Sequence, residues 1–438
     1  MSSLSDDTTP KQEKSKKSNG SAFPAGLHVV SPDQFSPDDP YWTSELLKDH
    51  EYALPILANA IIALDHAPEW QGVLGFDENS KTVIVREPPP WTGDSGFAWT
   101  DADTVRAMNW LQRQSDEHLR LVVPKETVHD AVNHVARLHP FHPIKEYLEH
   151  EPWDGERRLD CWLYLYLGVT PTDYTTAISR CFLISAVARI YQPGCQVDTC
   201  LILEGGQGTF KSTALRRLFH PWFTDQMPDI RTKDASIQLA GVWLAEFSDL
   251  SVFKESNREH LKAFLSRSTD RFRPVRGRYS IDMPRQNVFA GTTNEQYWHG
   301  DETGARRFWP VKIGTIDIPA LDRDRDQLWA EALVEYRKGS RWHLTIGEEV
   351  LAAEEQEARR QADVWEAPIA LYLSGQLETS VREILKFFIK RDIGDWNRWD
   401  ETRVSRCLQS LGWIKYRKRT GLVLEWKYRP GSCPIDDE

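Results

Sequence analysis

The sequence lacks the cysteine patterns that bind structural metals. None of its six cysteines forms a Cys-x-x-Cys pair, and no histidine lies beside Cys195 and Cys200, the two that are closest in sequence. A structural zinc site needs a close set of such ligands. We therefore expect reduced thiols in a protein of the cytoplasm, and neither a zinc site nor a disulfide framework.

Long hydrophobic runs are also missing. The longest apolar stretch, Pro55 to Leu64, is interrupted by Asn59 and is too short to span a membrane. The N-terminal segment is rich in Ser, Lys, Asp and Thr and has no apolar stretch of the kind found in a signal peptide. We predict a disordered tail over residues 1–25 and no association with membranes.

The chain has no overall excess of positive charge, since its formal net charge is −11. This argues against a surface that is coated by nucleic acid, but it leaves room for a local basic groove, where affinity for DNA resides. Basic residues gather near the C-terminal end. Residues 401–430 contain Arg403, Arg406, Lys415, Arg417, Lys418, Arg419, Lys427 and Arg429 against Glu401 and Glu425.

With 438 residues, 40% hydrophobic and 27% charged, the chain has the composition of a globular protein of two to four domains. In its middle, short apolar runs alternate with helical patterns, which indicates an α/β fold with a parallel sheet. After the N-terminal tail we divide the chain into a mixed α/β region (26–135), a helical region (136–195), a central α/β core (196–315), a helical segment (316–370), a small domain (371–430) and a tail (431–438).

Four apolar runs are the predicted strands of the core, namely Cys200–Leu203, Val242–Ala245, Asn287–Thr293 and Phe308–Ile313. Ligands of open parallel sheets bind at the carboxyl ends of the strands. The first run leads into a glycine-rich loop, the second ends at Glu246 and the third ends at Asn294. These features therefore predict a binding site at one edge of the sheet.

The glycine-rich loop is similar to the Walker A pattern G-x-x-x-x-G-K-[ST], although Phe210 replaces its second glycine. Glycines let backbone N–H groups turn inward around phosphates. Lys211 would contact the β- and γ-phosphates of ATP, and Ser212 would bind Mg²⁺. A glycine-rich turn with a surface lysine is the alternative. The predicted ATP-binding residues are Gly205, Gly206, Gln207, Gly208, Thr209, Phe210, Lys211, Ser212 and Thr213.

Hydrolysis also needs a carboxylate, a group that orients water and a cation for the γ-phosphate. Glu246 is the predicted acid, and Asp249 is a second candidate for holding Mg²⁺. Asn294 is the predicted water-orienting residue. Arg306 or Arg307 is predicted to reach the nucleotide of a neighbouring subunit. The alternatives are a solvated glutamate at a strand end, a turn asparagine and a surface arginine pair.

The stretch Arg271–Tyr279 combines basic and aromatic residues with a proline and a glycine. Such a segment suits a hairpin that grips a phosphate backbone and stacks on bases. A structural hairpin with solvated arginines is the alternative. The candidate DNA contacts are Arg273, Arg276, Arg278 and Lys262, and Arg267 and Arg285 would extend the patch.

The small domain has the pattern of a winged helix. We expect a helix over Val381–Ile389, a second helix capped by Asp400, and strands over Trp413–Arg417 and Leu422–Tyr428. The second helix would enter a groove of DNA while the strands contact phosphates. Docking of a protein is the alternative. The candidate DNA contacts are Arg403, Arg406, Lys415, Arg417, Lys418 and Arg419.

Together these segments resemble the virulence-associated protein E family of phages, prophages and phage-related islands. The family's core is similar to superfamily 3 helicases, a branch of the AAA+ ATPases. The N-terminal region shows no primase-polymerase module. The resemblance rests on Trp153–Gly155 with Arg158–Leu159, Ala188–Gly194, Gly205–Thr213, Gly291–Asn294 and Gly304–Val311.

This resemblance implies an AAA+-like P-loop core with a helical N-terminal region and a C-terminal winged helix. It implies a homo-hexameric helicase, driven by ATP and Mg²⁺, that moves 3′ to 5′ on single-stranded or forked DNA. Its setting would be the replication of a mobile element in the bacterial cytoplasm, with a primase or polymerase as a further partner. Two alternatives stay open: an origin-binding initiator without unwinding activity, and an ATPase of phage defence or DNA packaging.

Overall fold

The computed structural model describes residues 40–114, 117–227, 229–232, 234–248, 258–273, 279–295, 305–360, 363–390, 397–420 and 423–431. The predicted N-terminal tail, Asp249, Arg276, Arg278 and residues 432–438 of the predicted C-terminal tail lie outside these ranges. The chain forms two compact units. The first comprises the described residues up to Val73 with Glu87–Asp94 and Asp101–Val132, and the second comprises Leu74–Arg86, Ser95–Thr100 and the described residues from Asn133 onward.

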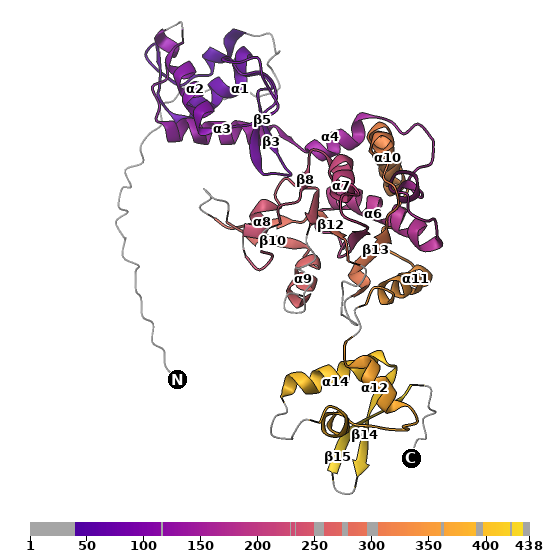
Figure 1. Cartoon of the computed structure of the whole chain (residues 1–438). Helices are drawn as coiled ribbons and strands as arrows, with labels where there is room; N and C mark the ends of the chain where they lie inside the picture. Colours follow the sequence, from indigo (N-terminus) through magenta and orange to yellow (C-terminus); the bar gives the residue numbers. More distant parts are fainter. Residues whose placement is uncertain are drawn as a thin grey trace, which may run out of the picture. The chain divides into compact units, whose positions relative to one another are not determined.

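The first unit consists of short elements around a cluster of tryptophans. The buried Trp70 ring has edge contacts with Trp91 and Trp110, with ring centroids 5.6 and 5.5 Å apart. The elements are η2 (Pro40–Ser44), β1 (Lys48–Asp49), β2 (Tyr52–Ala53), α1 (Leu57–His66), η3 (Pro68–Trp70), α2 (Asp101–Gln112), η4 (Glu117–Leu119) and the first part of α3 (Lys125–Leu138) (Figure 1).

The second unit begins with a small four-stranded sheet of order β5-β4-β3-β6. Neighbouring strands in it are antiparallel except β3 and β6, which run parallel. The sheet contains β3 (Leu74–Asp77), β4 (Thr82–Val85), β5 (Phe97–Ala98) and β6 (Pro140–Phe141).

The larger sheet of the second unit has five parallel strands in the order β13-β7-β12-β9-β8. Its strands are β7 (Cys200–Glu204), β8 (Phe223–Thr224), β9 (Leu244–Phe247), β12 (Val288–Thr293) and β13 (Phe308–Lys312). The α/β class is confirmed, and each of the four predicted strands overlaps an observed one, although β9 is shifted towards the C-terminus relative to the predicted Val242–Ala245. Pro310 has no N–H to donate, and it is tolerated because β13 lies at the edge of the sheet.

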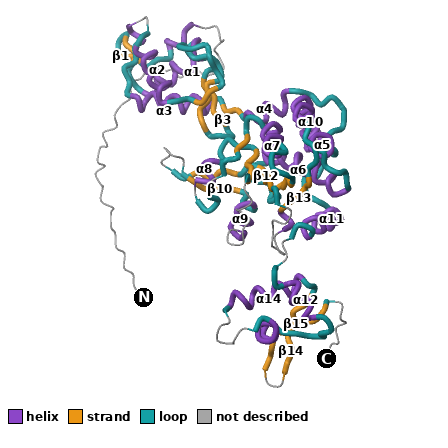
Figure 2. The backbone as a smooth tube through the Cα atoms, in the orientation of Figure 1, coloured by secondary structure: helices purple, strands orange, loops and turns teal. Residues whose placement is uncertain are grey.

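Both faces of this sheet are covered by helices (Figures 1 and 2). Leu201 and Leu203 pack on one side with α6 (Asp173–Tyr191), α7 (Lys211–Phe219) and α10 (Ile318–Arg337). Cys200 and Ile202 point to the other side, where α8 (Asp234–Gln238) and α9 (Arg258–Leu265) lie. Strands buried on both faces need continuous apolar runs. Three further helices that precede the small domain are α4 (Pro143–His150), α5 (Trp162–Leu167) and α11 (Ile346–Glu357).

Aromatic rings fill the side on which α7 and α10 pack. Phe219 has edge contacts with Trp243 and Trp329, both with ring centroids 5.0 Å apart. The Trp243 and Trp329 rings lie 4.2 Å apart. The Trp329 indole N–H donates to the Leu218 carbonyl at 2.9 Å, so this cluster fixes α7 on the sheet.

A short hairpin of β10 (Thr269–Phe272) and β11 (Ile281–Pro284) carries a buried ion pair. Arg285 is 1% exposed and donates to Asp270 at 2.6 and 3.0 Å. It also donates to the Phe264 carbonyl and lies over the Phe264 ring. The expectation that Arg285 extends a DNA-binding patch is therefore wrong, because its charge is buried and paired inside the protein.

The small domain has α12 (Glu366–Leu373), α13 (Val381–Glu383), the π-helical turn η8 (Ile384–Phe388), α14 (Arg398–Ser410), β14 (Trp413–Thr420) and β15 (Val423–Pro430). The predicted cap is wrong: Asn397 caps α14 by accepting from the Asp400 N–H at 2.8 Å, and Asp400 lies buried in the first turn. β14 and β15 form an antiparallel hairpin, as expected, and they are longer than predicted.

Replacing Asp270 by Asn tests the role of the buried ion pair. The Arg285 charge would lose its partner in a dry environment, which typically costs about 3–5 kcal/mol. We expect a clear fall in the denaturation midpoint of the full chain. Asp282→Asn is the matched control, since Asp282 forms an exposed pair with Arg271 in the same hairpin, and such pairs contribute at most about 1 kcal/mol. Equal effects of the two substitutions would contradict this role.

Candidate functional site

The loop between β7 and α7 is held against the end of β12. The Gly205 N–H donates to the Thr293 carbonyl at 3.1 Å. A Cβ at Gly205 would lie 2.7 Å from Ile313 Cγ1, so the loop requires glycine there. Phe210, which precedes α7, has a left-handed backbone with φ 61° and a side chain that is 61% exposed. Phe210 thus adopts a conformation that glycine normally supplies.

Lys211 is the first residue of α7 and is almost completely buried. Its Nζ donates to the carbonyl oxygens of Gly205 and Gly206 at 2.8 and 2.7 Å and to Asn294 Oδ1 at 2.9 Å. Burial lowers the pKa of Lys211, and the charge of Glu246 acts in the opposite direction. The structure therefore brings the loop lysine and the strand-end amide together.

Glu246 lies inside β9 and is fully buried, so the alternative of a solvated strand-end glutamate is wrong. Phe247 extends the strand beyond Glu246, because it packs in the sheet's second hydrophobic core. Glu246 Oε1 accepts hydrogen bonds from Ser212 Oγ at 2.5 Å and from Thr292 Oγ1 at 2.7 Å. Burial raises the pKa of the carboxyl group, while these two hydroxyls lower it.

The second carboxylate oxygen, Glu246 Oε2, is buried and has no hydrogen-bond partner among the residues that the structure describes. A buried carboxylate with an unsatisfied oxygen is costly unless it is protonated or meets a cation. Together with Ser212 Oγ it offers the oxygen ligands that Mg²⁺ prefers. The residues present therefore fit a divalent cation beside the loop.

Sequence reasoning missed the contribution of Thr292 to this site. Its position in β12, which pairs with β9, places its hydroxyl at Glu246. It also missed the ion pair between Glu204, the last residue of β7, and Arg359. The distance from Arg359 Nε to Glu204 Oε2 is 2.8 Å. A buried threonine in a glycine-containing strand was the available signal for Thr292, whereas nothing local identifies Arg359.

The two predicted finger arginines belong to η7 (Ala305–Arg307) and differ in their surroundings. Arg307 is half-buried, donates to Ser266 Oγ at 3.1 Å and lies 3.6 Å from Asp198. Arg306 is exposed. Only Arg306 therefore presents its guanidinium to the surface.

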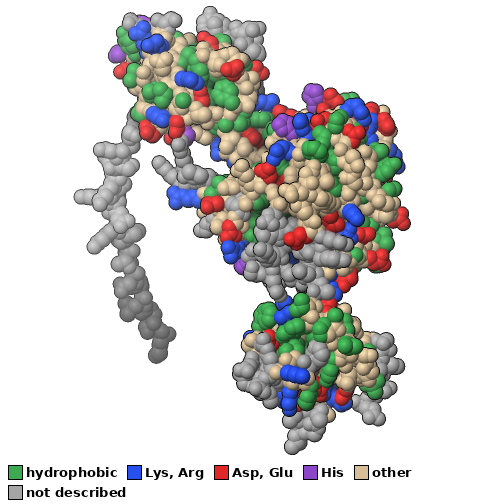
Figure 3. All heavy atoms as spheres, in the orientation of Figure 1, with side chains coloured by type: hydrophobic (Ala, Val, Ile, Leu, Met, Phe, Trp, Pro, Cys, Tyr) green, Lys and Arg blue, Asp and Glu red, His purple; other side chains and the backbone are tan. Residues whose placement is uncertain are grey.

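The predicted DNA contacts lie on several elements. Lys262 is half-buried on α9, and Arg273 is exposed after β10. On α14, Arg406 is exposed, whereas Arg403 donates to Asp363 at 2.7 and 2.8 Å. Figure 3 shows basic side chains beside hydrophobic ones on the surface of the small domain. Of its hairpin residues, Lys415, Arg417, Lys418 and Arg419 are exposed.

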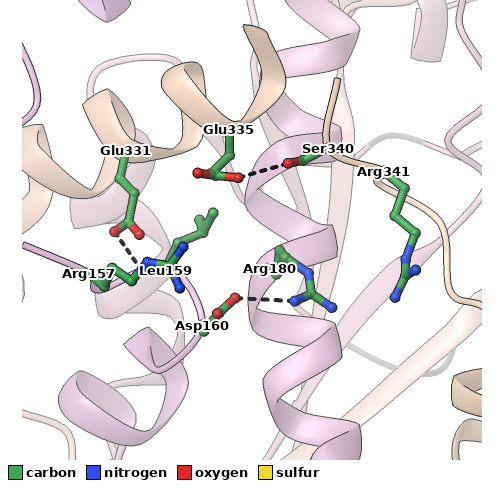
Figure 4. Close-up of a pocket in the computed structure, with 8 residues that line it drawn as sticks. All are labelled: Arg157, Leu159, Asp160, Arg180, Glu331, Glu335, Ser340 and Arg341. Atoms are coloured by element: carbon green, nitrogen blue, oxygen red, sulfur yellow. Dashed lines mark hydrogen bonds and ion pairs between the residues drawn. The ribbon is translucent and has the colours of Figure 1, made fainter. Parts of the chain in front are cut away.

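A separate pocket of about 330 Å³ is lined by polar groups that form hydrogen bonds with other groups of the protein (Figure 4). Glu331 accepts from the N–H groups of Arg158 and Leu159 at 2.6 and 2.8 Å. Glu335 accepts from Ser340 Oγ at 2.7 Å. These bonds connect α10 to neighbouring loops, which indicates a structural role. The pocket is lined by Arg157, Leu159, Asp160, Arg180, Glu331, Glu335, Ser340 and Arg341.

Within the described ranges, every helix is too short or too polar to span a bilayer.

Residues 148–361 match the virulence-associated protein E-like domain, which confirms the resemblance seen in the sequence. A search of curated proteins gave no match. Among solved structures, the apo NrS-1 C-terminal region is 11% identical with a TM-score of 0.41, over 81% of this chain and 95% of that one. Its A form is 12% identical with a TM-score of 0.42, over 88% and 100%.

The pH dependence of the stability of Glu246→Gln tests whether the carboxyl group of Glu246 is buried. Because the pKa is raised from its ordinary value of 4.5, the folded state binds the proton more tightly than the unfolded chain. The wild type then loses stability as pH rises from 4.5 through the raised pKa, and the variant does not.

We expect the melting temperature of Glu246→Gln, relative to the wild type, to increase between about pH 4 and pH 8. Glu401→Gln, at an exposed position of α14, is the matched surface control. A constant difference for Glu246→Gln would count against a buried, proton-binding carboxyl group.

Proposed function

We propose that residues 148–361, which match the virulence-associated protein E-like domain, form an AAA+-like P-loop ATPase core of a DNA helicase or translocase. The proposal is carried by one contact, the 2.5 Å hydrogen bond from Ser212 Oγ to Glu246 Oε1. Ser212 occupies the position that binds Mg²⁺ in a phosphate loop, and Glu246 is the buried acid of β9. The hydrogen bond therefore joins the loop to the acid. The expected setting is DNA replication of a phage or mobile element.

The sheet order supports a nucleotide site at the loop. β7 lies between β13 and β12, so the loop that follows it emerges from the interior of the sheet and not from an edge. α7 begins at Lys211, which directs the N–H groups of its first turn towards the loop. Anions bind well at such helix N-termini, and the α7 end fits a phosphate group.

The loop contacts suggest how ATP would be bound. Lys211 Nζ meets four neutral oxygens, on Gly205, Gly206, Thr209 and Asn294. We propose that phosphate oxygens replace the two carbonyl oxygens. A negatively charged phosphate oxygen accepts a stronger hydrogen bond from the lysine than a neutral carbonyl oxygen does. Ser212 and Glu246 would hold Mg²⁺, and the ion would neutralise charge on the β- and γ-phosphates.

Asn294 completes the proposed catalytic set. It follows β12, and its Oδ1 lies 2.9 Å from Lys211 Nζ. Once Lys211 contacts phosphate, the amide is free to orient a water molecule towards the γ-phosphate. Glu246 would polarise the same water, because its carboxylate lies beside Ser212. The site thus has the groups for hydrolysis in one place.

Arg306 is the better candidate for the arginine finger. Arg307 is held by Ser266 and Asp198 of its own subunit, whereas Arg306 is exposed. An exposed guanidinium can stabilise the transition state of a nucleotide bound to a neighbour. We therefore propose a homo-hexameric ring in which Arg306 completes the next subunit's site, with single-stranded or forked DNA and a primase or polymerase as partners.

The small domain supports DNA binding in the same assembly. Its helices α12, α13 and α14 with the hairpin β14–β15 have the element order of a winged helix. The hairpin corresponds to the wing, and it carries most of the basic residues of 401–430. We propose that this domain is a winged helix that brings DNA to the ATPase core.

Lys211→Ala tests the ATPase directly. We expect loss of ATP hydrolysis by about 10³-fold or more, both with and without single-stranded DNA, because the charge at the phosphates is removed. Hydrolysis is measured by phosphate release with Mg²⁺ present. Lys312→Ala, at an exposed position of β13, is the matched control. Hydrolysis or unwinding that persists in Lys211→Ala would rule out this motor.

Arg306→Ala should bind ATP but hydrolyse it about 10³-fold more slowly, since the finger acts in trans. Mixing it with Lys211→Ala subunits should restore activity, because each variant supplies the group that its neighbour lacks. Arg307→Ala should instead lower thermal stability. Native mass spectrometry in ATP, Mg²⁺ and DNA follows assembly. A fully active Arg306→Ala protein, or a monomer under these conditions, would exclude the trans arrangement.

A further inference from the structure

The hairpin β14–β15 presents two faces of different chemistry. Residues directly opposite each other in an antiparallel pair share a face, and alternate residues along a strand do too. Arg417 pairs with Trp426 and Arg419 pairs with Leu424. We define the Trp426 face as Lys415, Arg417, Arg419, Leu424 and Trp426.

The centre of this face is an exposed indole flanked by two cations. Trp426 is 49% exposed. Lys415 Nζ lies 4.6 Å from its ring centroid, and Arg417 Cζ lies 4.7 Å from the same centroid. Cation–π contacts of this length hold both charges beside the ring. The ring and the charges therefore form one preorganised surface.

On the opposite face, two of the three cations are paired with acids, and the third, Arg429, lies 5.1 Å from the Tyr416 ring centroid. Lys418 Nζ lies 2.6 Å from Glu378, which also accepts from the Tyr416 hydroxyl at 2.7 Å. Lys427 Nζ lies 2.8 Å from Glu383. On the Trp426 face, the residues that pair with its three cations are aromatic or aliphatic, and none is acidic. The two acid-paired lysines of the hairpin therefore lie on the face opposite Trp426.

The Trp426 face is fixed to the rest of the small domain. Tyr428, two residues along β15, is buried in the domain's core, and its hydroxyl hydrogen-bonds Ser405 of α14 at 2.6 Å. Trp413 at the start of β14 is buried in the same core. Thr379 and Tyr428 exchange backbone hydrogen bonds of 2.9 and 2.7 Å. These anchors present Trp426 on a rigid support.

We propose that the Trp426 face is a binding site for single-stranded DNA, in which an unpaired base stacks on Trp426 and the flanking phosphates meet Lys415, Arg417 and Arg419. Aromatic side chains next to cations are how proteins bind single strands without reading their sequence. Bases of a duplex are already stacked on each other, so the ring selects unpaired nucleotides. The inference deepens the proposed DNA-directed function and rests on it for the choice of DNA.

This site also changes the set of DNA contacts expected from the sequence. Lys418 belongs to the opposite face and its charge is taken by Glu378. Trp426, which charge alone does not single out, is the central residue. Successive side chains of a strand point to opposite faces, which places Lys418 on one face of the hairpin and Arg417 and Trp426 on the other.

Stacking is tested by fluorescence anisotropy of the full chain with a labelled oligothymidylate, in the absence of nucleotide. We expect Trp426→Ala to weaken binding by about 10-fold or more, which is the usual loss per stacked base. Trp426→Phe should keep most of the affinity. Trp426→Leu fills similar space without a π-face and should behave like Trp426→Ala. Circular dichroism melting checks that each variant is folded.

The charges are tested by the salt dependence of the same binding. Arg417→Gln should reduce the slope of log K against log salt concentration by about 0.7, the value for one phosphate contact on a single strand. Lys418→Gln removes an equal charge from the paired face and should leave the slope unchanged. Binding of a blunt duplex should not respond to Trp426→Ala.

Wild-type affinity for the single strand in Trp426→Ala, or equal slopes for Arg417→Gln and Lys418→Gln, would overturn the proposal. Equal losses for single strand and duplex would do the same. DNA binding is measured here without nucleotide and ATP hydrolysis is measured separately, so that a failure of the ATPase and a failure of this site are distinguished.

Discussion

The hydrogen bonds that pair β12 with both β7 and β9 fix the position of every polar group in the candidate site. In this register Thr293 lies opposite Glu204, and Ala290 lies opposite Glu246. Because the strands are parallel, the loop after β7, the acid of β9 and Asn294 after β12 meet at one edge of the sheet. The helices and aromatic rings that cover the sheet hold this register, and the site depends on it.

The same arrangement keeps charged groups buried at a cost to stability. Burial lowers the pKa of Lys211 and raises the pKa of Glu246, so each charge is disfavoured where it lies. Lys211 is surrounded by neutral oxygens, and within the described part of the chain one oxygen of Glu246 has no hydrogen-bond partner. Sites prepared for a charged ligand have this character, since their dipoles are oriented before the ligand arrives. The small domain shows a related principle on its surface. On the Trp426 face of its hairpin, the cross-strand partners of the three cations are aromatic or aliphatic residues.

Much of this was predictable because the local pattern reports burial. The core strands are apolar runs buried on both faces, and the pattern of Gly205, Lys211 and Ser212 predicts a phosphate-binding loop. What failed depended on distant partners. Arg285 looked like a surface cation, but Asp270 and Phe264 enclose it. The sequence pattern also ended a strand at Glu246, whereas packing of Phe247 extends β9, and the two residues of β8 are too few to show a period.

The most direct test of the account is a crystal structure of the full chain with Mg²⁺ and a non-hydrolysable ATP analogue. The account predicts that Lys211 Nζ leaves the carbonyl oxygens of Gly205 and Gly206 for the β- and γ-phosphates. It also predicts that Ser212 turns from Glu246 to the Mg²⁺ ion, with the carboxylate beside it. A nucleotide bound elsewhere, with the hydrogen bonds of Lys211 and Ser212 unchanged, would contradict the central claim that this sheet edge is an ATP site.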